Sequence, residues 1–267
     1  MTGRFNDRAD GTDEKNDLVR CLSDLGLPHD DQSETGAEES SDMSTSLPAG
    51  QRESQEFHRF GLTQFAERFP SQTESADLEV VGRVAHELQL RDALSGLPRT
   101  EQVCDFHCVT TWSCRALRWE GVRFVDFYSQ VVLPRAKPDE RATLVAFRAQ
   151  DGARTGMLLE DLLAPDVLLA DRLNGEAIPI DHGAPLRLIA PAHYGYKSIK
   201  HLSRIEFRDP SDDYRVSGLR FMDHPRARVA FEERGRVFPG WLLRFLYRPL
   251  IAGTVSRFAR ARSPKGR

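Results

Sequence analysis

The sequence predicts an α+β fold in which short strands and short helices are mixed along the chain. Runs of apolar and β-branched residues with strand length, such as "RATLVAFRA" and "LSRIEF", alternate with brief helical stretches. No strand–helix–strand period recurs, which argues against a doubly wound parallel sheet. The chain has 267 residues, of which 40% are hydrophobic, so it is long enough to bury a core.

Individual elements follow from the pattern of apolar residues and from turn signals. Strands are expected over residues 76–84, 102–110, 141–149, 184–191 and 202–207. Helices are expected over 88–98, from about Val125, and up to Pro165, before an extended segment and a turn at Asn174–Gly175.

The two ends of the chain differ in charge from the middle. Residues 1–50 hold twelve Asp or Glu against four Lys or Arg, whereas the chain from Arg234 onward holds nine Lys or Arg and no acidic residue. Four regions are therefore predicted: a disordered acidic tail over 1–55, an aromatic arm over 56–75, a domain over 76–210, and a basic aromatic extension over 211–267. Pro249 makes one unbroken helix in this extension unlikely to form.

A cluster of cysteines, "CDFHCVTTWS" at residues 104–113, permits four interpretations. A structural zinc site needs about four ligands in close pairs, and the C-x3-C and C-x5-C intervals offer no second pair. A nucleophilic cysteine needs a nearby base, but strand alternation places His107 on the face opposite Cys104 and Cys108. A buried core cysteine is the third interpretation, and a soft metal held by one thiolate beside an organic cofactor is the fourth.

A group of cations about seventy residues later could serve such a cofactor. His182, Arg187, Lys197 and Lys200 lie within nineteen positions, and Ser198 adds a hydroxyl. Arginine and lysine bind phosphate by charge-assisted hydrogen bonds. Taken one at a time, each is more often an ordinary surface cation beside a strand. The grouping predicts a pocket for an anionic cofactor only in combination with the cysteine cluster.

Five segments in a fixed order carry a resemblance to a known family. They are "LEVVGRV", "DFHCVTTWS", "RWEGVRF", "LLEDLLAPDVLLADRLNGEAIPIDHGAPLRLIAP" and "HYGYKSIKHLSRIEF". Together they resemble the molybdopterin-binding domain shared by sulfite oxidases and the catalytic subunit of bacterial protein-methionine-sulfoxide reductases. The resemblance runs from about residue 76 to 208. It implies a mixed-sheet α+β domain that holds molybdenum with one pyranopterin.

The resemblance also implies site residues. Cys108 matches the cysteine whose thiolate binds molybdenum and is central to catalysis. His182 and Arg187 match positions that contact the cofactor, and the segment that holds its phosphate matches Ser198, Ile199 and Lys200.

Neighbouring residues receive weaker assignments. His107 and Trp112 could shape the pocket, and His193, Tyr194 and Tyr196 could line a substrate funnel. Trp119 and Gly121 in "RWEGV" are expected to serve packing and a turn.

The implied activity is a two-electron oxygen-atom transfer on a small sulfur-containing or similar substrate, as in sulfite oxidases. The arginine patch of sulfite oxidases has its nearest counterparts here in Arg115 and Arg118. Sulfite oxidases also have an immunoglobulin-like dimerisation domain after the molybdenum domain, and residues 209–267 are too few to form one. A monomer is therefore expected. The start of the chain lacks a signal peptide and a twin-arginine leader, which predicts a cytoplasmic protein.

Partners are predicted from what the sequence lacks and from its basic end. No flavin or nicotinamide motif is evident, so a separate redox protein is expected to exchange electrons with the centre. The extension could contact a membrane surface peripherally, dock a partner or wrap over its own domain, and no nucleic-acid partner is expected. The rival interpretation is a non-catalytic, degenerate cofactor domain that acts as a docking module through this extension.

Overall fold

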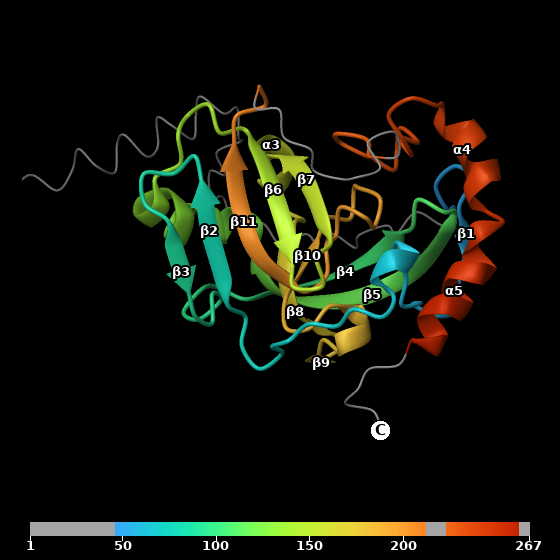
Figure 1. Cartoon of the computed structure of the whole chain (residues 1–267), viewed down its shortest axis with the longest axis horizontal. Helices are drawn as coiled ribbons and strands as arrows, with labels where there is room; N and C mark the ends of the chain where they lie inside the picture. Colours follow the sequence, from blue (N-terminus) through green and yellow to red (C-terminus); the bar gives the residue numbers. More distant parts are fainter. Residues whose placement is uncertain (1–45, 212–222, 262–267) are drawn as a thin grey trace, which may run out of the picture. The chain divides into compact units, whose positions relative to one another are not determined.

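The computed structural model describes residues 46–211 and 223–261, which form two β-sheets with short helices around them (Figure 1). In the first sheet the strand order is β1–β5–β8–β10, with β4 also paired to β5 and β9 to β8. All pairs are antiparallel except β1 with β5. Its strands are β1 (Arg52–Glu53), β4 (Thr100–His107), β5 (Trp112–Arg123), β8 (Leu168–Leu173), β9 (Glu176–Ala177) and β10 (Arg187–Ile189).

The second sheet has the strand order β3–β2–β11–β6–β7. It is mixed, because β11 runs parallel to β2 while the other neighbours are antiparallel. Its strands are β2 (Leu78–Gly82), β3 (Leu88–Leu90), β6 (Leu144–Ala149), β7 (Arg154–Leu158) and β11 (Leu202–Arg208). The α+β class with mixed sheets that the sequence predicts is confirmed.

The first sheet is buried on both faces, which explains its apolar runs. Leu169 and Leu188 belong to a core cluster that includes residues of the second sheet. Their neighbours Leu168 and Ile189 point the other way, into a cluster built around Trp119. Because successive side chains on a strand face opposite sides, a strand covered on both faces needs apolar residues at consecutive positions.

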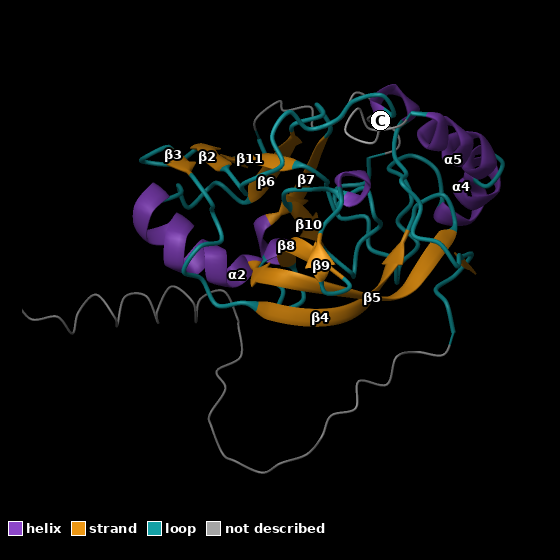
Figure 2. Cartoon of the chain, turned by 90° about the horizontal axis from the view of Figure 1, so that it is seen from below, coloured by secondary structure: helices purple, strands orange, loops and turns teal. Residues whose placement is uncertain are grey.

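The helices are short and lie at the margins of the sheets (Figure 2). The helical segments are α2 (Phe124–Phe127), which continues as a π-helical segment (Tyr128–Ala136), α3 (Leu159–Leu162), α4 (Gly240–Tyr247), α5 (Leu250–Arg260), and two 3₁₀ turns (Thr63–Phe65 and Ile180–His182). As expected, the C-terminal helix is interrupted: Pro249 stands between α4 and α5, where its fixed φ suits the start of a helix.

The aromatic arm packs on the first sheet but is mostly irregular. Phe57 and Phe60 pack against the Trp119 cluster, while only the turn Thr63–Phe65 is helical. Arg59 joins the arm to α5, because its Nη1 donates to the carbonyl oxygen of Ala261 at 2.7 Å. The helical spacing of phenylalanines therefore reflects contacts with the domain and not a continuous helix.

Two expectations from the sequence need correction. The helix expected over 88–98 is instead strand β3 followed by turns, because Leu88 and Leu90 alternate and pair with β2. The acidic tail predicted over 1–55 falls mostly outside the described residues, but Arg52–Glu53 pairs with Trp112–Ser113 as β1. A two-residue strand leaves no periodicity that a sequence pattern could reveal.

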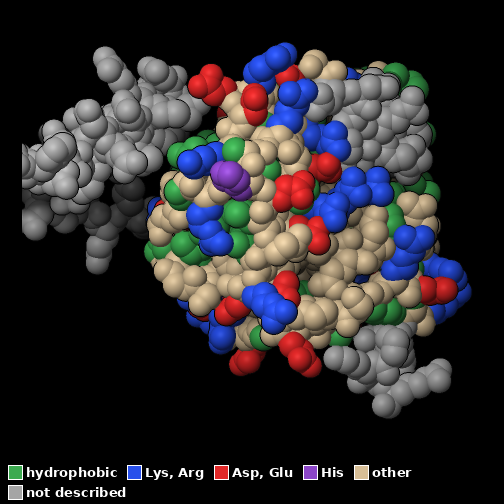
Figure 3. All heavy atoms as spheres, turned by 60° about the vertical axis from the view of Figure 1, so that its left-hand side comes forward, with side chains coloured by type: hydrophobic (Ala, Val, Ile, Leu, Met, Phe, Trp, Pro, Cys, Tyr) green, Lys and Arg blue, Asp and Glu red, His purple; other side chains and the backbone are tan. Residues whose placement is uncertain are grey.

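The surface carries charges of both signs. On the face shown in Figure 3, Lys and Arg side chains are interspersed with Asp and Glu. Within the described ranges, the search for helices of membrane-spanning length and hydrophobicity finds none.

Gly121 lies inside β5, not in the turn that the sequence suggests, and it provides the first prediction. A Cβ at this position would lie 2.0 Å from the carbonyl oxygen of Leu169 on β8. Gly121→Ala should therefore lower the free energy of unfolding by about 1–3 kcal/mol, the usual cost of overpacking. Urea unfolding followed by circular dichroism measures the change.

Gly253 in α5 is the matched control, since no atom lies within 4 Å of a Cβ added there. Gly253→Ala should raise the free energy of unfolding by about 0.5–1 kcal/mol, because alanine favours the helix. Equal effects of the two substitutions would contradict the close contact between β5 and β8.

Candidate functional site

Cys108 lies in the tight turn that joins β4 to β5. The backbone N–H of Cys108 donates to the carbonyl oxygen of Trp112 at 2.8 Å. The N–H of Thr111 donates to the carbonyl oxygen of Cys108 at 3.1 Å. Its Sγ lies 3.1 Å from Oγ1 of Thr110. Thr111 has a φ of 84°, which is strained for a β-branched residue. Such strain is often found at functional sites, where the surrounding structure holds the backbone in place.

The alternation predicted for this strand is confirmed. Cys104, Phe106 and Cys108 pack in one cluster, and all three described cysteines are free thiols. Burial raises the pKa of the Cys108 thiol and raises that of Cys104 to about 12. Among the described residues, no three His, Cys, Asp or Glu side chains lie close enough to share a metal ion, so Cys108 would have to be joined by ligands from outside the protein.

A cavity of about 420 Å³ brings the predicted site residues together. We call it the Cys108 cavity. Its lining includes all six of them: Cys108, His182, Arg187, Ser198, Ile199 and Lys200. They come from the β4–β5 turn, the 3₁₀ turn, β10 and the loop before β11, so the fold assembles them from distant parts of the sequence.

Arg187 is the most enclosed cation of this cavity, with 2% of its surface exposed. Its Nη1 donates to the carbonyl oxygen of His182 at 2.6 Å, and its Nη2 donates to that of Ser198 at 3.0 Å. The guanidinium lies 4.9 Å from the centroid of the Trp119 ring and 5.6 Å from that of Phe106. Its Nε is buried without a hydrogen-bond partner.

The cations around the cavity repel one another in a region that excludes water. Burial, followed by the charges of Arg187 and Arg59, lowers the pKa of Lys200 to about 7. Burial and the charge of Arg187 lower the pKa of His182 to about 4. Arg187 forms no ion pair with any carboxylate of the described residues, and burial lowers its pKa to about 9. A bound anion would offset this uncompensated positive charge.

Of the residues expected to line a substrate funnel, the structure places only Tyr196 on the cavity. His193 and Tyr194 are buried elsewhere, and Nδ1 of His193 lies 2.6 Å from the carbonyl oxygen of Arg226. Their assignment to the funnel is therefore wrong, because the Tyr194 ring packs inside the protein, 4.9 Å from the guanidinium of Arg234, and only Tyr196 of the three lines the cavity. Trp112, which was expected to shape the pocket, does line it.

Other polar residues singled out from the sequence do not line the cavity. The Nζ of Lys197 donates to the carbonyl oxygen of Gly156 at 2.7 Å and pairs with Asp223. Arg115 pairs with Asp105 at 3.5 Å, and Arg118 lies 3.9 Å from Glu101. These two arginines therefore do not form an anion-binding patch beside Cys108.

Comparison with known proteins identifies the family. The model of the oxidoreductase molybdopterin binding domain matches residues 66–215, which include Cys108 and the whole cation group. The chain belongs to this family. The resemblance stated from the sequence is thus confirmed, and the protein is a molybdopterin-binding oxidoreductase by family.

Several members of the family are similar over part of their length. The oxidoreductase YuiH of Bacillus subtilis is 39% identical over 132 residues, covering 49% of this chain and 64% of its own. The protein-methionine-sulfoxide reductase catalytic subunit MsrP is 34% identical over 135 residues in Xanthomonas campestris, covering 45% of this chain and 40% of MsrP. MsrP of Gluconobacter oxydans is 31% identical over 175 residues, which cover 57% of this chain and 54% of that MsrP. The chain thus spans between two fifths and two thirds of these relatives.

One solved structure was also found to be similar. The sulfane dehydrogenase SoxCD from Paracoccus pantotrophus aligns with a TM-score of 0.47 and 22% sequence identity. The alignment covers 57% of this chain and 43% of that one.

The residues of the Cys108 cavity fit the cofactor of the family. A single thiolate suits a soft metal whose other ligands come from an organic group. The uncompensated charges of Arg187 and Lys200 suit the cofactor's phosphate, to which arginine and lysine bind by charge-assisted hydrogen bonds. Among the residues that the structure describes, the buried Nε of Arg187 and Nε1 of Trp112 have no hydrogen-bond partner, which is consistent with a site that a polar ligand completes.

Sequence reasoning missed residues from both flanks of the family domain. Gln51 donates from its Nε2 to the carbonyl oxygen of Cys108 at 3.1 Å and accepts from Oγ of Ser113 at 3.1 Å. Arg234, fully buried, donates from Nη1 to the carbonyl oxygen of Val109 at 2.7 Å. Both lie outside residues 66–215, and no local pattern marks them, because their role comes only from long-range contacts.

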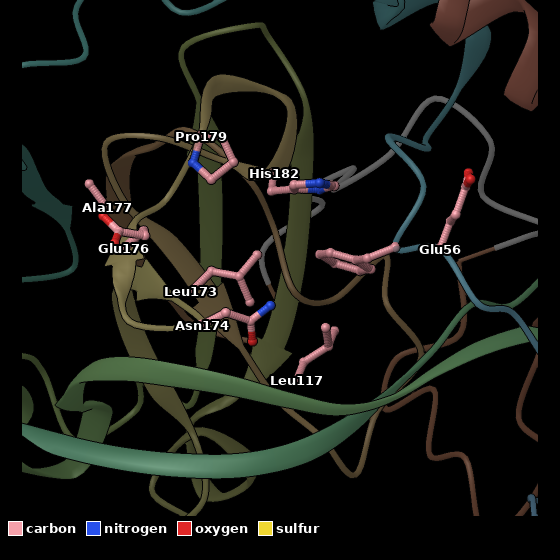
Figure 4. Close-up of a pocket in the computed structure, with 9 residues that line it drawn as sticks. Glu56, Leu117, Leu173, Asn174, Glu176, Ala177, Pro179 and His182 are labelled. Atoms are coloured by element: carbon pink, nitrogen blue, oxygen red, sulfur yellow. The ribbon is translucent and has the colours of Figure 1, made fainter.

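A second hollow lies beside the Cys108 cavity and shares two residues with it. Figure 4 shows Leu117, Leu173 and Asn174 on one side of it and Pro179 and His182 on another. The rings of His182 and Phe57 stack at 4.6 Å and line both spaces. This stacked pair is therefore part of the wall between them.

The second prediction concerns the charge of Lys200 in cofactor-free protein. Its pKa is about 7 in the folded chain against an ordinary value of 10.5. Between these pH values the unfolded chain binds more protons, so the free energy of unfolding should rise as the pH increases from about 7. Lys200→Met should abolish this rise and stabilise the protein most below pH 7, where the folded state bears the full cost of the buried charge.

Urea unfolding at several pH values measures this dependence. Lys137→Met, which removes an exposed lysine, is the control and should leave the rise unchanged. If the free energy of unfolding of the wild type, compared with that of Lys200→Met, fell between pH 7 and 9, the lowered pKa of Lys200 would be refuted.

The third prediction concerns Gln51 as a positioning residue for the Cys108 turn. Gln51→Met should lower the free energy of unfolding by about 1–3 kcal/mol, since it leaves the buried carbonyl of Cys108 without its donor. It should also alter the molybdenum electron-paramagnetic signal of protein loaded with cofactor, because the turn that carries the thiolate would relax.

Gln102→Met is the control, since it removes a comparable bond from Gln102 to the carbonyl oxygen of Asp166 on the same sheet. It should cost stability without changing the signal. Identical spectra for wild type and Gln51→Met would show that Gln51 supports only the fold.

Proposed function

We propose that the protein is a molybdenum cofactor-dependent oxidoreductase that carries out two-electron oxygen-atom transfer on a small sulfur compound. The observation that carries this proposal is the convergence of six residues, Cys108 to Lys200, on one cavity. The family match supports the cofactor, and relatives named as protein-methionine-sulfoxide reductases support a sulfur substrate. When bound, the molybdenum–pyranopterin supplies the oxygen-atom and electron-pair exchange.

The chain's own residues would bind and orient the group. Cys108 would hold the metal through its thiolate, on a turn that Gln51 and Arg234 fix. Arg187 and Lys200 would neutralise the phosphate, and Ser198 lines the same cavity. The Oγ of Ser198 already accepts from the N–H of Ala190 at 3.1 Å, so its hydroxyl proton is free to donate to an anion.

The cavity favours a neutral substrate over sulfite. Much of its lining is formed by apolar and aromatic side chains: Phe60, Phe65, Val109, Trp112, Tyr247, Leu250 and Phe258. Arg115 and Arg118, the nearest counterparts of an anion-binding patch, are paired with carboxylates outside it. We therefore favour an organic sulfoxide as the substrate class.

Electron supply would come from a separate protein or a diffusible mediator. The chain carries no flavin or nicotinamide motif, so an external donor must provide two electrons for each sulfoxide reduced to a sulfide and water, together with two protons.

The fourth prediction tests this function. Protein made in a host that synthesises the cofactor should contain molybdenum and pterin, measured by elemental analysis and pterin fluorescence. It should reduce an organic sulfoxide with a reduced viologen dye, with a larger kcat/KM than for sulfite oxidation. Cys108→Ala should lower this activity by about two orders of magnitude or more.

Cys114→Ala is the matched control, since Cys114 is equally buried but does not line the cavity. It should keep most of the activity. Full activity in Cys108→Ala, or a wild-type preparation without molybdenum and pterin, would refute the proposal. A preference for sulfite would refute only the substrate class.

A further inference from the structure

The C-terminal helices expose a continuous apolar surface that the domain does not cover. Four large side chains of α4 and the start of α5 are more than half exposed: Trp241 at 56%, Phe245 at 56%, Leu246 at 57% and Leu250 at 53%. On the opposite side of α4, Leu243 and Tyr247 are buried against the domain. A helix that is apolar on both sides normally has an apolar partner on each.

The segment that carries this surface is strongly basic. From Arg234 to the C-terminal residue there are nine Lys or Arg and no Asp or Glu. Arg257 is paired with Glu67 and Arg234 is buried beside Glu232, but Arg236 and Arg260 are exposed at the two ends of the helical region. The partner should therefore be both apolar and negatively charged.

We propose that this face, formed by Trp241, Phe245, Leu246 and Leu250, docks on the surface of an anionic lipid membrane. Short helices with exposed aromatic and aliphatic side chains and arginines nearby lie in the membrane interface, where the apolar groups enter the acyl boundary and the cations meet the headgroups. Neither described helix is long and apolar enough to span a membrane, so the contact is peripheral.

Charge argues against a second copy of the chain as the occupant. A two-fold contact would place the same surface on both sides and bring the arginines of one copy close to those of the other. An anionic membrane instead attracts them. The aromatic side chains also match a membrane interface, where tryptophan in particular is enriched.

The proposed docking face lies against the Cys108 cavity. Tyr247, Thr254 and Phe258, the buried side chains of the two helices, line the cavity, and Leu250 contributes to both the lining and the exposed surface. Docking would therefore place this wall of the cavity at the membrane. The inference goes beyond the proposed chemistry and does not depend on it.

Tryptophan fluorescence gives a direct test with the full chain. Trp112 and Trp119 are buried at 4% and 0% exposure, so a spectral change on adding vesicles reports mainly on Trp241. Vesicles containing phosphatidylglycerol should shift the emission to shorter wavelength and sediment with the protein. Vesicles of phosphatidylcholine alone should bind at least about tenfold more weakly, and raised salt should weaken binding to the anionic ones.

Two variants make the test specific. Phe245→Ser combined with Leu246→Ser keeps Trp241 as a reporter and should weaken binding by about tenfold or more, because it removes exposed apolar groups. Val103→Ser, which changes an exposed apolar residue on β4, should bind as the wild type does. Circular dichroism confirms that both variants are folded.

Three results would overturn the proposal. One is the absence of binding to anionic vesicles. Another is binding that the double substitution leaves unchanged. The third is a wild-type protein that does not bind vesicles but dimerises with rising concentration in analytical ultracentrifugation, while the double variant stays monomeric. That result would assign the face to a second copy of the chain.

Discussion

The buried guanidinium of Arg187 is the constraint on which the site depends. Taking a charge out of water costs several kcal/mol unless other groups replace its hydration. Here the carbonyl oxygens of His182 and Ser198 and the faces of aromatic rings do so in part. The remaining cost is a reason for the fold to bind an anion, because a ligand that binds only the folded state stabilises it. Under the function proposed above, affinity for the cofactor and stability of the domain would therefore be linked through this side chain.

The second requirement of the site is a rigid turn for the thiolate. Thr111 holds a strained backbone, and the turn resists relaxation because it is tied from both ends of the chain, by Gln51 and by Arg234. These ties form a chain of hydrogen bonds. Since Ser113 donates to Oε1 of Gln51, Nδ1 of His107 must donate to Ser113 at 2.8 Å, which fixes the tautomer of that histidine. Segments outside the family domain thus fix the turn that carries Cys108.

Local patterns in the sequence were sufficient for strands β2, β4, β6, β10 and β11 and for which residues share the Cys108 face, because alternation along a strand needs no partner to be read. They did not reveal β5 or β7. They failed where a distant contact decides the structure. Leu88–Leu90 is a strand only because β2 is beside it, and Gly121 is required only because Leu169 lies against it. The six site residues came from a family resemblance. His193 and Tyr194 were misplaced because their direction depends on a loop without a regular period.

The Cys108 cavity has a cationic wall and an apolar wall, which come from different parts of the chain. The cationic wall comes from β10 and the loop before β11, inside the family domain, and it suits the cofactor. Much of the apolar wall comes from the arm and from α4 and α5, outside residues 66–215. Apart from Gln51 and Arg234, which tie the Cys108 turn, these flanking residues contribute wall and none of the cationic contacts, so they are a place where a family with common chemistry could set its choice of substrate. Under the function proposed above, Phe60, Tyr247 and Phe258 would contribute to that choice, because these apolar and aromatic side chains carry no positive charge for an oxyanion.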